Sequence, residues 1–383
     1  MHLADNSKLW IGAYYYDSAL LAPEHMQKLT ESFLDFLVVS NPKDELSTLL
    51  SLCRPYGIGI ISSSLIPFWW GDEGDSAGQY GTKNVPAFIA QMDGTLQEDP
   101  LYWGDYLLDE PNAADFDAMQ ETIAAYKKRF PDKVPFVNLY PAYASHKQLG
   151  GTYEEHIRDY VAKVDTSYIC YDYYPFLADE TWENYRRNLK VVADACRESG
   201  RDFWLIAQAG AFKEEMPNET MIRHQGWMGL AFGMRALMHA CYSPGWWHEK
   251  TSMVDKKGED SQMFHFVRRL NTTLHRLSPV YMPYRNVGTY ENPAHVPGYD
   301  IKADRAIVIG AMEKEGGRAL VLANGENPTG PLDIATVSLA LPENETATIY
   351  YYGLATRPVV ENGRFTVTLP LGEGAFVVFE PKQ

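Results

Sequence analysis

Two adjacent carboxylates, Asp109 and Glu110, follow directly on the apolar run at residues 103–108. Pro111 comes next, and because proline cannot donate to a central ladder it ends the predicted strand there. A strand interior this apolar is buried, so acidic side chains at its carboxyl end lie either at a helix N-terminus or at the mouth of a site. The neighbouring segments decide between these two interpretations.

The segments on both sides of this stretch alternate between strand and helix patterns. Apolar β-rich runs alternate with segments of helical spacing, which predicts parallel strand pairing. Eight such units within roughly 280 residues is the number found in a TIM (β/α)8 barrel. The expected strands are 9–16, 33–40, 57–65, the one within 103–112, 134–140, 167–176, 202–212 and 235–247, and the expected helices are 23–31, 44–56, 86–96, 116–130, 153–164, 180–199, 221–233 and 261–277.

The pattern changes after Pro279. Alternating β runs separated by Gly, Pro and Asn replace helical periodicity from residue 287 to the end. We therefore expect a barrel domain over residues 1–280 and a small antiparallel β-sandwich over residues 281–383.

Composition and charge narrow the classes of partner. The net charge is −16 and Lys and Arg form no cluster, which argues against nucleic acid. The apolar runs are too short for a membrane helix, and residues 1–6 do not resemble a signal peptide. The four cysteines, Cys53, Cys170, Cys196 and Cys241, form no CxxC pair and are expected to be free buried thiols. A cytoplasmic location is expected, unless a signal peptide was trimmed, which would make the protein periplasmic or secreted.

In a TIM barrel the strand carboxyl ends and the following loops form the site, so their polar residues can be collected. Carboxylates, amides and aromatic rings converge there, and the chain is rich in rings, with 25 Tyr and 9 Trp. Acids for chemistry, amides for hydroxyl groups and rings for apolar sugar faces are typical of a sugar-binding cleft. The strand ends supply Tyr14, Tyr15, Tyr16, Asp17, Asn41, Ser62, Ser63, Ser64, Trp69, Trp70, Asp109, Glu110, Asn138, Tyr140, Tyr171, Asp172, Tyr173, Tyr174, Gln208, Tyr242, Trp246, Trp247, His248 and Glu249.

Several of these residues also have a purely structural interpretation. Asp109 and Glu110 can simply favour the next helix N-terminus, and Asp172 can orient a neighbour instead of acting itself. Glu249, next to a lysine, is typical of a solvated loop. In each tryptophan pair, 69–70 and 246–247, one ring is expected to face the ligand. No HxH or HExxH motif occurs, so we expect no metal and no cofactor.

The ordered series GDYLLDEP, VNLYPAYA, YDYYPF, FWLIAQAG and RHQGWMGLAFG resembles the clan A glycoside hydrolase barrels, often labelled beta-galactosidase-like. The match runs over most of the barrel, and a C-terminal β domain is usual in such enzymes. The resemblance implies a retaining hydrolase with Glu110 as general acid/base. The sequence departs from the family twice, with Asp109 in place of the usual Asn and Gln208 in place of the nucleophilic Glu of strand seven.

Three hypotheses can explain how the reaction proceeds without the nucleophilic Glu of strand seven. In the first, Asp172 or Glu249 acts from strand six or eight. The second is similar to substrate-assisted hexosaminidases, in which Glu110 is the acid, Asp109 steadies an acetamido group, and Tyr171 or Tyr174 helps. The third is similar to alpha-galactosidase barrels, with a fourth-strand carboxylate as nucleophile and Asp172 as acid/base. The separation of the carboxyl groups distinguishes retention from inversion.

We predict a glycoside hydrolase that cleaves an oligosaccharide or glycoside, with Glu110 as proton donor and Asp109 raising its pKa by like-charge repulsion. Asp172 is the preferred second carboxylate, followed by Glu249. The short aromatic loops favour exo action at a chain end. The residues expected to contact the carbohydrate are Tyr14, Tyr16, Trp69, Asn138, Tyr140, Tyr171, Tyr174, Gln208 and Trp247.

Two rival functions remain open. A non-catalytic carbohydrate-binding barrel would lack the strand-seven Glu, and a lyase or isomerase acting on a sugar acid would need a basic site that the strand ends do not provide. The sequence patterns do not indicate which sugar, anomer or linkage is recognised, or the oligomeric state.

Overall fold

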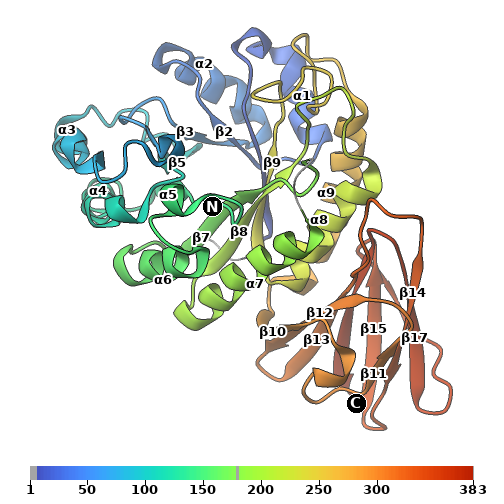
Figure 1. Cartoon of the computed structure of the whole chain (residues 1–383). Helices are drawn as coiled ribbons and strands as arrows, with labels where there is room; N and C mark the ends of the chain where they lie inside the picture. The colour runs from blue at the N-terminus through green and yellow to red at the C-terminus, as the bar shows by residue number, and fades with distance from the viewer. Residues whose placement is uncertain (1–6, 178–180, 383) are drawn as a thin grey trace. The chain divides into compact units, whose positions relative to one another are not determined.

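The computed structural model of the chain describes residues 7–177 and 181–382 (Figure 1). The described residues divide into two compact units, the first made of residues 10–216 and 236–264 and the second of residues 7–9, 217–235 and 265–382. The predicted start of a helix at Glu180 and the signal-peptide analysis of residues 1–6 lie outside the described residues. The division into a barrel domain over residues 1–280 and a sandwich domain over residues 281–383 remains a prediction.

Eight parallel strands close into a barrel in the first unit. The ladder runs from β5 through β3, β2, β1, β9 and β8 to β7, and β6 pairs with β5. A parallel bridge between Leu139 and Tyr171 joins the end of β6 to β7 and closes the ring. The expected TIM barrel is therefore confirmed. Its strands are β1 Trp10–Tyr14, β2 Phe36–Val39, β3 Gly59–Ser62, β5 Tyr102–Asp109, β6 Val134–Asn138, β7 Tyr168–Tyr173, β8 Asp202–Gln208 and β9 Met234–Ala240.

A helix follows each barrel strand in the chain, as the 3.6-residue spacing of apolar positions predicts. In α6, Tyr153, Ile157 and Tyr160 are buried on one face, and Thr152 caps the first turn in a capping box with Glu155. The helices are α1 Pro23–Glu31, α2 Lys43–Cys53, α3 Val85–Gln91, α4 Phe116–Arg129, α5 His146–Leu149, α6 Tyr153–Lys163, α7 Trp182–Ser199, α8 Glu219–Ala231 and α9 Gln262–Tyr281.

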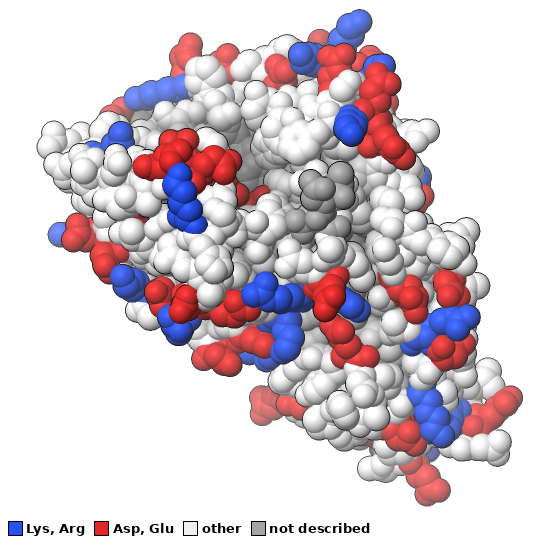
Figure 2. All heavy atoms as spheres, in the orientation of Figure 1, with Lys and Arg blue, Asp and Glu red and all other residues white. Residues whose placement is uncertain are grey.

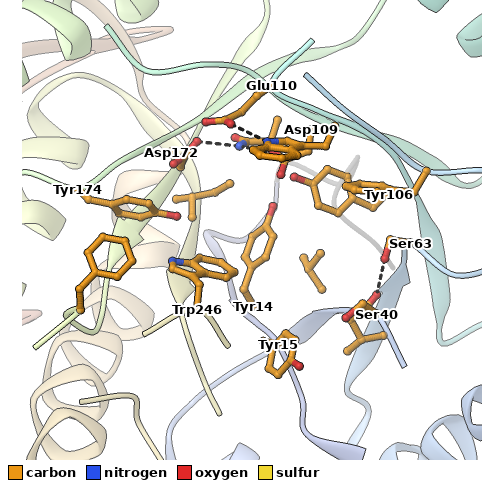
Figure 3. A pocket seen from close by; sticks show the side chains of 17 residues that line it. Tyr14, Tyr15, Ser40, Ser63, Tyr106, Asp109, Glu110, Asp172, Tyr174 and Trp246 are labelled. Carbon is orange, nitrogen blue, oxygen red and sulfur yellow. Dashed lines mark hydrogen bonds between the residues drawn. The ribbon is translucent and has the colours of Figure 1, made fainter. Parts of the chain in front are cut away.

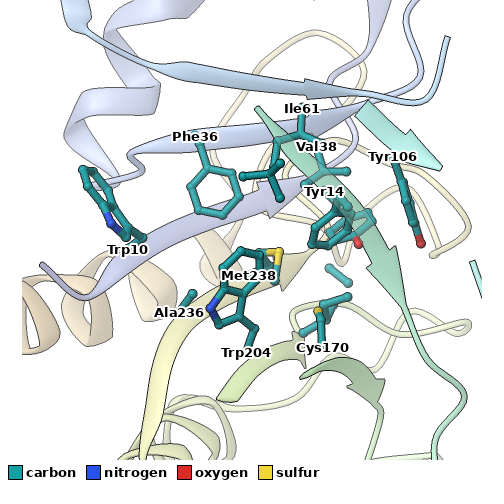
Figure 4. Close-up of a cluster of buried hydrophobic side chains, with 14 of the residues drawn as sticks. Trp10, Tyr14, Phe36, Val38, Ile61, Tyr106, Cys170, Trp204, Ala236 and Met238 are labelled. Carbon is teal, nitrogen blue, oxygen red and sulfur yellow. The ribbon is translucent and has the colours of Figure 1, made fainter. Parts of the chain in front are cut away.

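Large aromatic side chains fill the barrel interior (Figure 4). The rings of Tyr168 and Trp204 stack with centroids 3.7 Å apart and planes 3° apart. Trp103 needs so much room that a Cβ on Gly59 of the neighbouring strand would lie 2.1 Å from its ring. Interior packing of this kind makes the barrel a solid core, so a ligand can enter only at the ends of the strands.

Strand β5 is irregular in its pairing. Its register shifts against β3 between Tyr102 and Gly104, and against β6 between Tyr106 and Leu108. With these two shifts, Trp103 and Tyr106 belong to the interior cluster although they are three residues apart. Asp105, between them, instead accepts hydrogen bonds from two tyrosine hydroxyls outside that cluster.

The second unit contains a β-sandwich of two antiparallel sheets, as expected from the alternating runs. One sheet has the order β10-β12-β13-β18-β15-β16 and the other the order β11-β14-β17, and inward side chains from both sheets form one core. The sequence patterns did not indicate β10, β11, β14 and β16. The strands are β10 Arg285–Tyr290, β11 Ile301–Ala303, β12 Ile307–Lys314, β13 Gly317–Asn324, β14 Ile334–Ala340, β15 Glu345–Tyr351, β16 Leu354–Thr356, β17 Arg364–Pro370 and β18 Gly374–Pro381.

Helix α8 packs within this second unit through a buried ion pair. The guanidinium of Arg223 contacts the carboxylate of Glu373, to which the Trp227 indole also donates at 3.2 Å. The low exposure of both charged groups is tolerated because two guanidinium N–H groups bond to the carboxylate, which also accepts from Trp227.

Candidate active site

A pocket of about 540 Å³ opens at the carboxyl ends of the barrel strands (Figure 3). Ring side chains and three carboxyl groups dominate its lining, and among residues 7–177 and 181–382 no Lys or Arg side chain lines it. Figure 2 shows a hollow in the barrel unit, with a group of Asp and Glu side chains along one edge. The lining residues are Tyr14, Tyr15, Val38, Val39, Ser40, Ser63, Phe68, Trp70, Tyr106, Asp109, Glu110, Asn138, Asp172, Tyr174, Ile206, Phe212 and Trp246.

Asp109, Asn138 and Asp172 form the polar floor of the pocket. Each lies at or near the end of its strand, β5, β6 or β7. The side-chain amide of Asn138 donates from one nitrogen to Asp109 Oδ1 at 3.0 Å and to Asp172 Oδ1 at 2.8 Å. One amide therefore holds two carboxyl groups in a fixed arrangement in a site that contains no cation within the described lining.

Glu110 reaches the same pocket although it directly follows Asp109. In a regular strand successive side chains point to opposite faces, but Glu110 has a φ of 50°, in the left-handed region. Its backbone N–H donates to the Asn138 carbonyl at 2.8 Å, and its carboxylate accepts a hydrogen bond from the Trp70 indole at 3.0 Å. The backbone turn brings both adjacent acids into one site (Figure 3).

The short strand β4, Trp69–Trp70, fixes this turn from the other side. It pairs with the end of β5, with Trp70 opposite Asp109, and the N–H of Gly71 donates to the Asp109 carbonyl at 3.0 Å. A Cβ on Gly71 would lie 1.8 Å from the Glu110 carbonyl oxygen. Only glycine permits this approach of the two backbones.

Burial raises the pKa of all three carboxyl groups. The pKa of Glu110 is raised to about 9, by desolvation first, then by the charges of Asp172 and Asp109, while the Trp70 hydrogen bond lowers it. The pKa of Asp172 is raised to about 7 by desolvation and then by Asp109, and the pKa of Asp109 is raised by desolvation against hydrogen bonds from Tyr106 and Asn138. The expected repulsion from Asp109 is present, but desolvation and Asp172 contribute more to the pKa of Glu110.

A continuous aromatic wall borders the carboxyl groups. Ring centroids are 5.1 Å apart for Phe68 and Tyr106, 6.0 Å for Tyr106 and Tyr14, 6.2 Å for Tyr14 and Trp246, and 6.5 Å for Trp246 and Tyr174. Tyr14 is buried, and its hydroxyl interacts with the side chain of Tyr106 and with the charge of Asp109.

Six of the predicted site residues line this pocket. They come from four barrel strands, β1, β5, β6 and β7, and from the residues that directly follow β5 and β7. The structure brings together Tyr14, Asp109, Glu110, Asn138, Asp172 and Tyr174.

Four predicted ligand contacts lie outside the lining because their rings pack elsewhere. Tyr16 stacks on Tyr242 at 5.8 Å and donates to the Leu20 carbonyl, and Tyr171 stacks on Phe203 at 5.8 Å. The other two are the buried rings of Tyr140, which packs near His156, and Trp69, which packs on Tyr80.

Gln208, Trp247 and Glu249 also lie outside the lining. The Gln208 side chain accepts from the Phe176 N–H at 2.9 Å and donates to the Gly210 carbonyl at 3.0 Å, so both ends of its amide are engaged by backbone. Trp247 is buried with its indole bonded to the Ala240 carbonyl, and Glu249 is exposed. The placement of Glu249 does not favour it as a second carboxylate.

Several lining residues were missed by the sequence reasoning, chiefly Phe68, Tyr106 and Phe212, whereas Tyr15 and Ser63 were collected at the strand ends but not chosen as ligand contacts. One ring of each tryptophan pair faces the pocket as expected, but the rings are Trp70 and Trp246 instead of Trp69 and Trp247. For Trp70 the register opposite Asp109 decides the face, and no sequence pattern carries that register. Phe212 and Trp246 lie on loops, where side-chain periodicity gives no signal.

The structure also bears on the cysteines, on metal binding and on membrane spans. The four cysteines are free and buried, which confirms the prediction for them. Within the described ranges no group of three or more His, Cys, Asp or Glu side chains is arranged to hold a metal ion. No helix of the described chain is long and apolar enough to span a membrane.

Comparison with known proteins gives similarity in structure alone. No protein-family model matches the sequence, and no curated protein matches it. A solved structure described as a glycoside hydrolase has a TM-score of 0.58 and 9% sequence identity over 98% of this chain and 93% of its own. This chain has the fold of a glycoside hydrolase barrel.

A second solved structure agrees with this fold. It is described as a putative alpha-L-fucosidase from Bacteroides thetaiotaomicron VPI-5482 and has a TM-score of 0.51 and 12% identity over 70% of this chain and 96% of its own. The resemblance to glycoside hydrolase barrels inferred from the sequence motifs is thus confirmed at the level of the fold. At these identities the comparison carries no residue assignment.

Proposed function

We propose that the protein is a glycoside hydrolase in which Glu110 donates a proton to the leaving oxygen. The observation that carries the proposal is the grouping of Glu110, Asp109 and Asp172 in one aromatic pocket at the carboxyl ends of the barrel strands. The fold shared with glycoside hydrolases supports the same reaction class. Glycosidic bond cleavage needs an acid and a second carboxyl group on either side of the sugar, and this pocket supplies both types.

Glu110 is suited to the role of acid. Its raised pKa of about 9 keeps the carboxyl group protonated at neutral pH. A protonated carboxylic acid held at this position can transfer its proton as the bond to the leaving oxygen breaks.

Asp172 is the proposed second carboxyl group. It lines the pocket from β7 and receives the Asn138 amide and a hydrogen bond from Tyr174. Ionised Asp172 would act on the sugar from the side of β7, either by stabilising positive charge at the anomeric carbon or by bonding to it. The assignment of Asp172 as acid/base, as in the alpha-galactosidase type, reverses these roles and predicts that loss of Asp172 removes the proton donor.

The carbohydrate would bind between the aromatic wall and the polar floor. Tyr14, Tyr174 and Trp246 would pack on apolar ring faces, while Asn138 and the carboxylates would bond to hydroxyl groups. Absence of Lys and Arg from the described lining fits a neutral substrate better than a sugar acid. The short aromatic loops favour action at a chain end, which we include in the proposal.

A specific observation favours a second candidate, a substrate-assisted N-acetylhexosaminidase. Asp109 lies beside Glu110 and close to the hydroxyl of Tyr14, so an acceptor and a donor suited to an acetamido N–H and C=O lie together. Gln208, at the strand-seven position of the usual nucleophile, is engaged with backbone. In this candidate the acetamido oxygen of the substrate replaces the second carboxylate.

The test is a screen of wild type and Glu110→Gln against nitrophenyl glycosides, N-acetylhexosaminides included, with NMR detection of the first-formed anomer. Turnover that is lost in Glu110→Gln supports the hydrolase, and turnover confined to N-acetylhexosaminides supports the second candidate. Sugar binding without turnover on any glycoside would instead identify a non-catalytic binding barrel, and an unsaturated product would identify a lyase.

A further inference from the structure

We propose that Trp70 forms the leaving-group subsite of the pocket and positions Glu110, its indole N–H orienting the carboxyl group and its ring face stacking on the sugar or aryl group that departs. The inference rests on the proposed hydrolase function. It assigns the exposed ring face of Trp70 to the binding of a flat apolar pyranose or aryl face, and the proposed reaction otherwise gives that ring face no role.

The first step is the contact between the two side chains. Trp70 Nε1 donates to Glu110 Oε2 at 3.0 Å. Because that oxygen is engaged as an acceptor, the proton is carried by Oε1, which the indole leaves unengaged. Trp70 therefore selects which carboxyl oxygen acts as the acid.

The second step follows from what a general acid must touch. Glu110 donates to the glycosidic oxygen, so the group attached to that oxygen on the departing side lies next to the residue that holds Glu110. Trp70 is that residue, and its side chain remains 46% exposed while lining the pocket. Phe68, 42% exposed, extends the same apolar surface. Asp172 lies on β7 and Tyr174 directly after it. In the ladder β5 and β6 separate β7 from β4, so these two residues are left for the sugar that is retained.

The third step is the rigidity of the segment that carries Trp70. Strand β4 is bonded to β5, Asp115 accepts from the N–H groups of Gly78 and Tyr80, and Gln148 donates to Glu73 at 2.9 Å. A ring held this way loses little freedom on binding, so it is well suited to a stacking platform.

The charged and titratable groups that face Glu110 are Asp109 on the same strand, Asp172 on β7, Glu73 after β4 and Tyr140 after β6. All three acids raise the pKa of Glu110, and the Trp70 N–H lowers it. Removal of that N–H is therefore expected to raise the pKa of Glu110 further.

The test compares Trp70→Phe, which keeps a ring but loses the N–H, with Trp70→Ala, which loses both. Trp182→Phe, at the start of α7 and outside the lining, is the matched control. For Trp70→Phe we expect KM within about twofold of wild type, kcat lower by about tenfold, and an alkaline limb of the kcat profile at higher pH. For Trp70→Ala we expect KM to rise by about tenfold for aryl and disaccharide substrates and to change little for methyl glycosides.

An unshifted pH profile in Trp70→Phe would overturn the positioning role, and an equal KM change for methyl and aryl glycosides in Trp70→Ala would overturn the subsite. NMR of the Trp70 indole N–H supplies a readout without turnover: its resonance should titrate with pH in wild type and not in Glu110→Gln. If wild type hydrolyses no glycoside, the hydrolase and the leaving-group subsite both fail, while an indole titration would still establish the contact with Glu110. A resonance that does not titrate overturns the positioning role alone.

Discussion

Asp109 on β5 and Asp172 on β7 share one hydrogen-bond donor, the Nδ2 of Asn138, which is 3.0 Å from the first carboxylate and 2.8 Å from the second. Two carboxyl groups held by one neutral amide repel each other, and that repulsion contributes to the raised pKa of Asp172. The arrangement links the ionisation of the pocket to the identity of residue 138.

Asn138→Ala is expected to move the acid limb of the kcat/KM profile to higher pH. The Asn138 amide stabilises ionised Asp172, so without it the pKa of Asp172 rises above its value of about 7. We also expect kcat at the pH optimum to fall by about tenfold or more, because the carboxylates lose their fixed arrangement. An acid limb at the wild-type position would show that Asp172 does not control it.

The wild-type profile itself is expected to be bell-shaped. Asp172 must be ionised, so activity is lost as the pH falls through about 7, and Glu110 must be protonated, so activity is lost as the pH rises through about 9. The two ionisations give the two limbs of one profile. Initial rates measured from pH 5 to 10 at low substrate concentration test this; full activity at pH 5 would contradict it.

Glu110→Gln is expected to abolish turnover while leaving binding of a substrate within about tenfold of wild type. The amide preserves the shape of the side chain but cannot donate the proton. Single-turnover kinetics and calorimetric titration with the same glycoside provide the two measurements. Glu249→Gln is the matched control, because Glu249 is exposed and outside the pocket, and it should retain wild-type activity.

The same Glu110→Gln variant is expected to be more stable than wild type at alkaline pH. The pKa of Glu110 is raised from 4.5 to about 9 in the folded state, so between these values the folded protein binds more protons than the unfolded chain. Stability therefore falls as the pH rises from about 4.5 to about 9, and the amide removes this dependence. We expect a Tm gain of about 3 °C or more at pH 9 and little gain at pH 4, measured by calorimetry. Equal gains at both pH values would rule out this cause.

Gly71→Ala is expected to remove activity and lower stability together. The added Cβ would lie 1.8 Å from the Glu110 carbonyl oxygen, so β4 must separate from β5 and the contact between Trp70 and Glu110 is lost. We expect kcat to fall by about a hundredfold and Tm by several degrees. Gly200→Ala is the control: Gly200 ends α7 with φ of 71° and open space around it, so the variant should lose stability only.

The sequence determined the barrel and the outline of its site. The alternation of β-rich runs with helical spacing predicted all eight barrel strands, because parallel strands and their helices have side-chain periods of 2 and 3.6. Strand-end position then identified Asp109, Glu110, Asn138 and Asp172, since the carboxyl ends of parallel strands meet on one face. The β-sandwich followed from alternation in the same way, although the sequence patterns did not indicate four of its strands, β10, β11, β14 and β16.

Tertiary structure decided which aromatic rings meet the ligand and how adjacent acids reach one pocket. The register of β4 against β5 turns Trp70 inward and leaves Trp69 to pack on Tyr80, and the positive φ of Glu110 places it beside Asp109. Neither feature is local: both depend on backbone contacts between segments far apart in the chain, such as the Glu110 N–H with the Asn138 carbonyl. A sequence records side-chain type and period, whereas strand register and backbone turns follow from the packing of the whole barrel.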